Sequence, residues 1–379
     1  MTKKIMLVFG TRPEAIKMAP LYHALKSRPD LFETQVCVTA QHRQMLDQVL
    51  RVFDIRADID LNLMKAGQDL FDITSSVMLG MREVLAIHRP DVLLVHGDTT
   101  TTLASSIAAF YSNIHIGHIE AGLRTHDLYA PFPEEFNRQV ASKVAKWHFS
   151  PTSTSCENLL DEGVSESQIT VTGNTVIDAL FWVLNRINSD AQRQTQIEAF
   201  LNEHLSFSWK IDRFVLITGH RRENFGDGFM QICEALKELA IRYPDVHFVY
   251  PVHLNPNVQE PVNSILLGLS NVHLITPLDY EPFVYLLKHC YLVLTDSGGI
   301  QEEAPSLGKP VLVMRDVTER PEAVDAGTVR LVGANRERII HNVSELLDNQ
   351  ITYKKMSLSH NPYGDGNACK KIIDVLEKI

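Results

Sequence analysis

Short, uninterrupted runs of apolar residues alternate with amphipathic stretches along almost the whole chain of 379 residues. A strand that is covered on both faces needs apolar side chains on both, so its sequence reads as a continuous apolar run. The pattern therefore predicts two sets of buried parallel strands. They are residues 5–9, 34–39, 92–95, 114–119 and 147–150 in the first half, and 214–218, 247–250, 272–275, 292–295, 310–313 and 328–331 in the second.

The amphipathic stretches between these runs predict helices on both faces of each sheet. They cover residues 13–27, 44–53, 69–88, 99–111, 136–145, 228–242, 280–289 and 299–307. Because the chain is longer than one compact core usually serves, we predict an α/β fold of two Rossmann-like domains facing each other across a cleft. We assign residues 1–172 to the first domain, 173–365 to the second, and 366–379 to a terminal helix that crosses back to the first or stays on the second.

Composition excludes several classes of protein. The formal net charge of −10 argues against nucleic-acid and anionic-membrane partners, both of which favour basic surfaces. No apolar run approaches the length of a membrane-spanning helix, and the stretch at residues 5–9 is too short for a signal peptide. The five cysteines are odd in number and scattered, which is typical of a reducing compartment, so we expect a cytoplasmic protein.

The unusual polar residues gather where the predicted strands end. They occupy residues 10–14, 97–99, 120–122, 219–223, 251–253 and 296–299. Ligands of doubly wound sheets bind at the carboxyl ends of the strands. Together these segments predict a ligand site lined from both domains.

Two of these segments suit an anionic ligand. Ser297, Gly298 and Gly299 lead into a helix whose first N–H groups and positive dipole end can hold a phosphate, and Glu303 lies about one turn further on, within reach of ribose hydroxyls. The alternative is a plain strand-to-helix turn. Arg12, with Lys17 on the next turn, is a second candidate phosphate ligand, against the alternative of solvated charges on a capped helix.

Three carboxylates are candidates for catalysis, and His220 with Arg221 and Arg222 forms a concentrated positive charge, against the alternative of a surface salt-bridge cluster with Glu223. Asp98 and Glu120 end neighbouring strands, Glu134 follows a proline-containing loop, and His220 follows a strand of the second half. Converging carboxylates repel one another unless a ligand or a proton offsets the charge. Asp98 has the alternative role of an N-cap for the next helix.

We predict no metal site. His115 and His118 are three residues apart in a strand and therefore point to opposite faces.

The strings at these positions resemble the non-hydrolysing UDP-N-acetylglucosamine 2-epimerases. They are GTRPEA (10–15), GDTTTT (97–102), HIEAGLR (118–124), PFPEE (131–135), TGNT (172–175), GHRREN (219–224), PVHLNP (251–256) and TDSGGIQEE (295–303). The resemblance runs from about residue 5 to NPYGDG at residues 361–366.

The resemblance implies a fold like that of the GT-B glycosyltransferases, a homodimer, no cofactor, and interconversion of UDP-GlcNAc and UDP-ManNAc for surface polysaccharide synthesis. By position it implies three groups of residues. The catalytic group is Asp98, Glu120, Glu134 and His220. The UDP-binding group is Arg12, Lys17, Ser297, Gly298, Gly299 and Glu303. The third group resembles the family's contacts to a second, activating UDP-GlcNAc and consists of Gln41, Gln44, Arg221 and His253.

The reaction implied is elimination of UDP to a 2-acetamidoglucal, followed by re-addition with the other configuration at carbon-2. Inversion at this carbon asks for at least two carboxylates, one to remove the proton and one to return it from the opposite side. The alternatives are a retaining GT-B glycosyltransferase, a hydrolysing epimerase, a non-catalytic nucleotide-sugar sensor, and an epimerase of a modified UDP-hexosamine.

Overall fold

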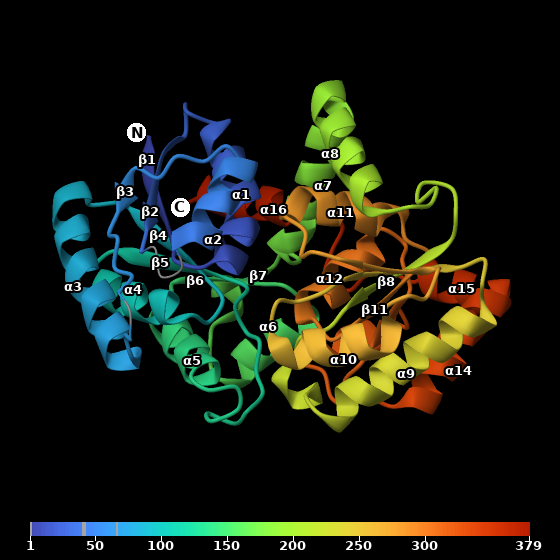
Figure 1. Cartoon of the computed structure of the whole chain (residues 1–379). Coiled ribbons are helices and arrows are strands. Elements are labelled where there is room, and N and C mark those ends of the chain that lie inside the picture. The colour runs from blue at the N-terminus through green and yellow to red at the C-terminus, as the bar shows by residue number, and fades with distance from the viewer. Residues whose placement is uncertain (1, 40–42, 66) are drawn as a thin grey trace. The chain divides into compact units, whose positions relative to one another are not determined.

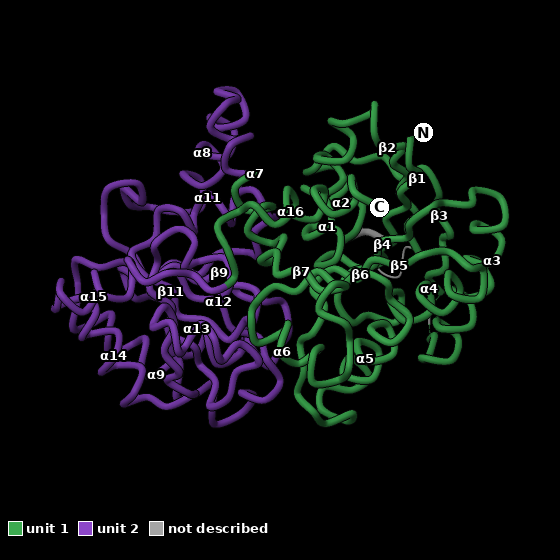
Figure 2. Tube along the Cα trace, turned by 180° about the vertical axis from the view of Figure 1, so that it is seen from behind, with its two compact units in different colours: residues 1–182, 363–379 green, residues 183–362 purple. Residues whose placement is uncertain are grey.

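The computed structural model describes residues 2–39, 43–65 and 67–379, with the side chains of residues 43 and 44 left out. Two compact units make up the chain (Figure 2). Unit 1 contains Met1–Trp182 and Tyr363–Ile379, and unit 2 contains Val183–Pro362. The sequence suggested a boundary after residue 172, whereas the division by contacts falls inside one long helix, α7 (Thr175–Ser189).

Unit 1 is built on a parallel sheet of seven strands in the order β3-β2-β1-β4-β5-β6-β7. The strands are β1 (Lys3–Phe9), β2 (Phe32–Val38), β3 (Ile59–Asp60), β4 (Val92–His96), β5 (His115–Ile119), β6 (Trp147–Ser150) and β7 (Ile169–Val171). The central strand β1 is buried on both faces, since all five residues from Ile5 to Phe9 are at most 1% exposed. This double burial is the reason that the strand reads as an unbroken apolar run.

Helices cover both faces of this sheet. Figure 1 shows α3 and α4 on one side of the central strands and α1 with α2 on the other. A buried core joins Met6 and Val8 of β1 to Met81 of α3 and Ala104 of α4. The helices are α1 (Arg12–Lys26), α2 (Arg43–Val52), α3 (Leu70–His88), α4 (Thr100–Tyr111), α5 (Glu134–Val144), α6 (Ser153–Asp161) and α16 (Ala368–Leu376), with a 3-10 turn η1 (Glu166–Gln168).

Unit 2 repeats the architecture with six parallel strands in the order β10-β9-β8-β11-β12-β13. The strands are β8 (Phe214–Thr218), β9 (His247–Pro251), β10 (Val272–Ile275), β11 (Leu292–Thr295), β12 (Val311–Val313) and β13 (Val329–Leu331). Its helices are α8 (Ala191–His204), α9 (Asp227–Arg242), α10 (Pro256–Leu266), α11 (Tyr280–His289), α12 (Gly298–Ser306), α13 (Pro321–Asp325), α14 (Arg336–Asp348) and α15 (Gln350–Ser357), with a 3-10 turn η2 (Arg222–Asn224).

In each unit the strand order reverses once, and this reversal places the site. On one side of the first strand of each unit lie the second strand and then the third, and on its other side lies the fourth. At such a switch point the loops after the first and fourth strands diverge and leave a crevice. In unit 1 these loops follow β1 and β4, and in unit 2 they follow β8 and β11. Four of the polar segments found in the sequence are these loops.

The predicted strands and helices lie where the sequence placed them, with ends that differ by a few residues. The expected terminal helix, α16, belongs to unit 1 and packs against α1. Two short strands, β3 and β7, and several helices of the second half, such as α8 and α14, were not predicted. In the described part of the chain no helix is long and apolar enough to cross a membrane.

Substituting Gly122 tests how tightly the loop after β5 is packed. A Cβ atom at Gly122 would lie 2.1 Å from the Ser155 carbonyl oxygen, whereas a Cβ atom at Gly163 would meet nothing within 4 Å. Both glycines have positive φ angles, 93° and 82°, so alanine is strained by about 1 kcal/mol at either. We expect Gly122→Ala to lower the free energy of unfolding by about 1–3 kcal/mol more than Gly163→Ala, because of the additional clash. Urea unfolding of the two variants measures the difference, and equal losses would contradict this packing.

Candidate functional site

The crevice of unit 1 is held together by Glu14, which is 2% exposed. Its Oε2 accepts hydrogen bonds from the N–H groups of Gly10 and Thr11, at 3.0 and 2.8 Å, after β1. Its Oε1 accepts a 2.6 Å bond from the Thr99 hydroxyl, after β4. Burial raises the pKa of Glu14, and these hydrogen bonds oppose that rise. One side chain thus fixes the spacing of the two loops that flank the switch point.

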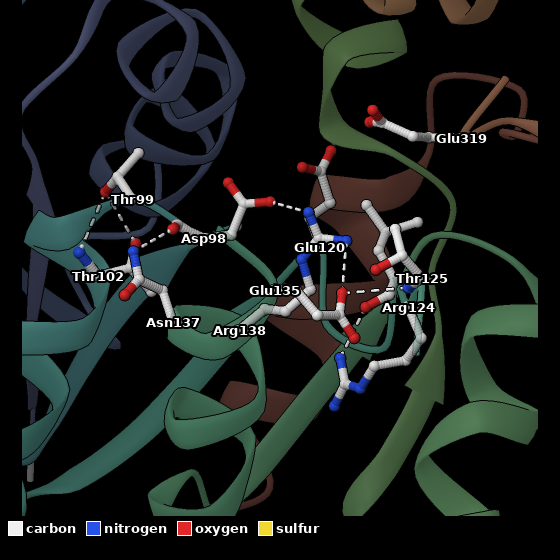
Figure 3. A network of polar contacts seen from close by, with 12 residues as sticks. Asp98, Thr99, Thr102, Glu120, Arg124, Thr125, Glu135, Asn137, Arg138 and Glu319 are labelled. Atoms are coloured by element: carbon white, nitrogen blue, oxygen red, sulfur yellow. Dashed lines mark hydrogen bonds and ion pairs between the residues drawn. The ribbon is translucent and has the colours of Figure 1, made fainter. Parts of the chain in front are cut away.

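Asp98 lies between β4 and α4 and pairs with a buried arginine. Its Oδ2 accepts a 2.5 Å bond from Nη2 of Arg138 on α5, and its carbonyl oxygen accepts a 2.8 Å bond from the Asn137 amide (Figure 3). The pKa of Asp98 lies above its usual value chiefly because of burial, while Arg138 acts in the opposite direction. The N-cap of α4 is Thr99, whose hydroxyl accepts the Thr102 N–H, so the capping role considered for Asp98 is wrong.

Glu120 follows β5 and has a φ of 60°, which is unusual for a residue with a side chain. Its Oε2 forms an ion pair with Lys17 of α1 and accepts a 2.7 Å hydrogen bond from the Asn174 amide. The side chains of Lys17 and Glu120 are 13% and 8% exposed. A strained backbone that holds a buried, paired carboxylate is a common feature of functional sites. Lys17, expected to bind UDP, therefore also neutralises Glu120.

Glu134 is the first residue of α5 and is partly exposed. Its charge raises the pKa of Asp98, as does that of Glu120. The three carboxylates expected to act together are therefore close enough to influence one another within unit 1. Among the described residues, none forms a hydrogen bond or ion pair with the Glu134 carboxylate.

Buried neutral histidines lie behind these carboxylates. Nε2 of His96, at the end of β4, is 4.0 Å from Oε2 of Glu120, and burial lowers the pKa of His96 to about 4. Nε2 of His118, on β5, lies 2.7 Å from the Gly97 carbonyl oxygen, and burial lowers its pKa to about 3. His115 is exposed, as expected from its opposite orientation in the strand.

The crevice of unit 2 is also organised by a buried carboxylate. Asp296, after β11, is fully buried, and its Oδ2 accepts the N–H groups of His220 and Arg221 at 2.7 and 2.8 Å, after β8. Nδ1 of His220 lies 3.6 Å from the other oxygen of Asp296. The His220 ring stacks on His253 at 5.2 Å between centroids and keeps 48% of its side chain exposed.

The N-terminus of α12 presents an anion-binding arrangement. The N-cap residue, Ser297, makes no side-chain capping bond, which leaves the first N–H groups of the helix available. A Cβ atom at Gly298 would lie 3.8 Å from Cζ of Arg320 and 3.9 Å from Nη2 of Arg221. Two guanidinium groups and a helix dipole therefore converge on the position that the sequence assigned to phosphate.

Glu303 lies within α12, is 8% exposed, and accepts a 3.0 Å hydrogen bond from the hydroxyl of Tyr280 on α11. This bond fixes the carboxylate that the sequence suggested for the ribose hydroxyls.

The remaining predicted residues are placed as follows. Arg12 is the first residue of α1. Gln41 and the side chain of Gln44 lie outside the described residues. Within the described ranges there is no group of three or more His, Cys, Asp and Glu suited to a metal ion.

Sequence reasoning gave no role to four residues that support the site, namely Arg138, Asp296, Asn174 and Arg320. Asp296 and Asn174 stand inside strings that the sequence singled out, but the partner of each of the four lies in a distant part of the chain, and no local pattern reveals such pairs. Glu14 did carry a signal. It stands three residues after Thr11, the spacing of a capping box, and the structure shows that box.

Three comparisons place the chain among known proteins. Residues 23–377 match the family described as "UDP-N-acetylglucosamine 2-epimerase". A Yersinia pestis protein of that name is 59% identical over 374 residues, which cover 99% of this chain and 98% of the relative.

Two solved structures extend the likeness to the fold. The Neisseria meningitidis UDP-GlcNAc 2-epimerase bound to UDP-GlcNAc is 51% identical, with a TM-score of 0.90 and coverage of 99% of this chain and 100% of that one. The Staphylococcus aureus MnaA–UDP structure is 44% identical, with a TM-score of 0.87 and coverage of 99% and 96%. The fold class is accordingly GT-B-like.

The buried His118 predicts a loss of stability in acid. The pKa of His118 in the folded protein, about 3, lies below the ordinary histidine value of 6.5, so between these values the unfolded chain binds a proton that the folded chain does not. The resulting stability is complete above about pH 6.5 and is lost as the pH falls toward 3. We expect His118→Gln to reduce the slope of unfolding free energy against pH by about 1.4 kcal/mol per pH unit between about pH 4 and 6. Urea unfolding measures this slope; His115→Gln, at the exposed histidine, serves as control, and identical slopes for both variants would contradict the burial argument.

Proposed function

The chain belongs to the UDP-N-acetylglucosamine 2-epimerase family, and from this membership we propose that it interconverts UDP-GlcNAc and UDP-ManNAc by inverting carbon-2 of the hexosamine. The enzyme is an isomerase. The observation that carries the proposal is the gathering of Asp98, Glu120 and Glu134 in unit 1, two of them held by buried cations.

The difficulty of the reaction lies at carbon-2. This carbon is not next to a carbonyl group, so its proton is removable only as the anomeric C–O bond weakens. In the first step a carboxylate takes the carbon-2 proton, the C–H electron pair forms the double bond of 2-acetamidoglucal, and the C1–O pair leaves with UDP. In the return step UDP attacks carbon-1 and a carboxylic acid delivers a proton to the opposite face of carbon-2.

The leaving diphosphate needs positive charge and hydrogen-bond donors that are already in place. Unit 2 offers the N-terminus of α12, with Ser297, Gly298 and Gly299, together with Arg320 and His220. We assign these groups to the diphosphate and Glu303 to the ribose. Arg12 and Lys17 of α1 complete the proposed UDP-binding set.

The carboxylates of unit 1 are assigned to proton transfer. Asp98 and Glu120 lie after neighbouring strands and are each paired with a cation, Arg138 and Lys17 respectively. These partners favour the anionic form, which a general base requires. Glu134, which has no such cation among the described residues, is the third member of the proposed proton-transfer set.

Three other functions on the same scaffold make different predictions. A retaining glycosyltransferase would need an acceptor site and has no use for several carboxylates at carbon-2. A hydrolysing epimerase would release free ManNAc, so the products distinguish it. An epimerase of a modified UDP-hexosamine would share the diphosphate contacts, and a panel of UDP-sugars tests that alternative.

A second molecule of UDP-GlcNAc is proposed as an activator, with Arg221 and His253 among its contacts. Both residues lie beside His220: the Arg221 N–H shares the Asp296 carboxylate with the His220 N–H, and His253 stacks on the His220 ring.

We further propose a cytoplasmic enzyme that supplies ManNAc units for surface polysaccharide. All five cysteines are unpaired, which fits a reducing compartment.

Replacing the three carboxylates tests the catalytic assignment. We expect Asp98→Asn, Glu120→Gln and Glu134→Gln each to lower turnover of UDP-GlcNAc by about 10²–10⁴-fold, because each removes a proton-transfer group. Anion-exchange separation of the UDP-sugars measures turnover, and calorimetry should show UDP binding retained. Glu157→Gln, on the exposed face of α6, is the control. Near-normal turnover in any of the three variants would remove that residue from the mechanism.

Exposed apolar side chains of unit 1 support the proposed homodimer. Apolar side chains stand exposed on α3 and α4: Phe71 is 84%, Leu79 54%, Ile87 76% and Tyr111 73% exposed. Beside them lies a groove of about 440 Å³ lined by residues of α3, α4 and α5. Exposed apolar side chains next to a groove are typical of protein–protein contacts.

A charge placed among these side chains should separate the subunits. We expect the wild type to have the mass of a dimer and Leu79→Arg that of a monomer, because burying an unpaired guanidinium in an apolar interface is strongly unfavourable. Light scattering coupled to gel filtration measures the mass. Ile211→Arg is the matched control, because Ile211 is an isolated apolar residue of unit 2 that is 85% exposed. A Leu79→Arg dimer would place the interface elsewhere.

A further inference from the structure

Arg138 stands out among the charged residues of unit 1 that the reaction itself does not use. Its side chain is 7% exposed and lies between two carboxylates of different kinds. Nη2 donates to Oδ2 of Asp98 at 2.5 Å, and Nη1 lies 3.3 Å from Oε2 of Glu135 (Figure 3). Its Nε is buried without a hydrogen-bond partner. The two terminal nitrogens of the guanidinium therefore each contact one of these two acids.

Glu135 is fully buried and fixed from the other side. Its carboxylate accepts the N–H groups of Thr125 and His126 at 3.1 and 3.3 Å, and the Gln139 amide at 2.9 Å. It is therefore anchored to the loop after β5 as well as to its own helix. Because the acid that Nη1 of Arg138 contacts is itself held in place, the guanidinium is fixed too, and its Nη2 reaches Asp98 from a fixed direction.

We propose that Arg138 is a positioning residue that keeps the Asp98 carboxylate ionised and fixed in place for proton removal, with Glu135 as its anchor. The proposal rests on the epimerase function proposed above. Arg138 acts through Asp98 and is assigned no contact with substrate. The backbone of Asp98 is held separately by the Asn137 amide, which lies next to Arg138 on α5.

The charges around Asp98 explain why a permanent cation is required there. Burial, Glu120 and Glu134 all disfavour its ionised form, and Arg138 is the group that opposes them directly. Other charged or titratable groups near this crevice lie on α1, β4 and β5. They include Arg12, the first residue of α1, the buried neutral His96 and His118, Lys17, which is paired with Glu120, and Glu14, which is held by hydroxyl and amide groups. A guanidinium stays protonated at every pH at which the enzyme operates.

The test separates the charge of Arg138 from its role in packing. Arg138→Lys and Arg138→Gln both remove the planar fork, but only lysine keeps the positive charge. Activity of a general base is lost as the pH falls through its pKa, so a raised pKa moves the acidic limb of the kcat/KM profile to higher pH. We expect this limb to rise by about 1–3 pH units in Arg138→Gln and to stay within about one unit of the wild type in Arg138→Lys.

Kinetics and a matched control complete the experiment. At a pH below its raised limb, Arg138→Gln should lose kcat by about tenfold or more with little change in KM for UDP-GlcNAc, since substrate contacts are intact. Arg124→Gln removes another buried arginine of unit 1, which is paired with Glu162 at 2.6 Å, and should lower the melting temperature without moving the limb.

Several results would overturn the proposal. They are an Arg138→Gln limb at the wild-type pH, equal shifts for the Lys and Gln variants, or an equal shift for Arg124→Gln. If Arg138→Gln does not fold, an acidic limb displaced by more than about one pH unit in Arg138→Lys would likewise overturn the proposal. A wild-type protein that forms no UDP-ManNAc would instead refute the epimerase function, so the two failures are distinguishable.

Discussion

In each unit a buried carboxylate joins the two loops that flank the reversal of strand order, and the candidate site depends on these two contacts. In unit 1 Glu14 ties the loop after β1 to the loop after β4. In unit 2 Asp296, which follows β11, accepts the backbone N–H groups after β8. A parallel sheet necessarily leaves its strand ends diverging at a switch point. A buried acidic side chain that links the two loops turns that opening into a fixed frame.

The partners of the carboxylates at the site differ in a way that matches their proposed roles. Glu14 and Asp296 accept hydrogen bonds from neutral hydroxyl and amide groups, as suits acids that hold loops. Asp98 and Glu120 are each paired with a cation. Breaking a buried ion pair leaves an uncompensated charge, which is strongly destabilising, so such pairs persist only where their geometry is well supported. The cation-paired acids are those assigned to chemistry.

Most of the strand positions could be predicted from sequence because double burial leaves a plain signal, as in the unbroken apolar run of β1. The clusters at strand ends were predictable for the same reason, since parallel strands bring their carboxyl ends to one edge. β3 was missed because it has two residues, too few for any pattern. The partners of the site residues were missed for a different reason: Arg138 and Asp98 are 40 residues apart, and Asn174 and Glu120 are 54 apart. Local patterns in a single sequence do not reveal such pairings.

The central claim is that carboxylates of unit 1 remove and return the proton at carbon-2 of a UDP-hexosamine. Incubating the wild-type enzyme with UDP-GlcNAc in D₂O and observing carbon-2 by NMR tests it most directly. The account predicts that the manno product carries deuterium at carbon-2, because the returned proton comes from a carboxyl group that has exchanged with solvent. A manno product that keeps the original hydrogen, or substrate that remains unchanged, would contradict it.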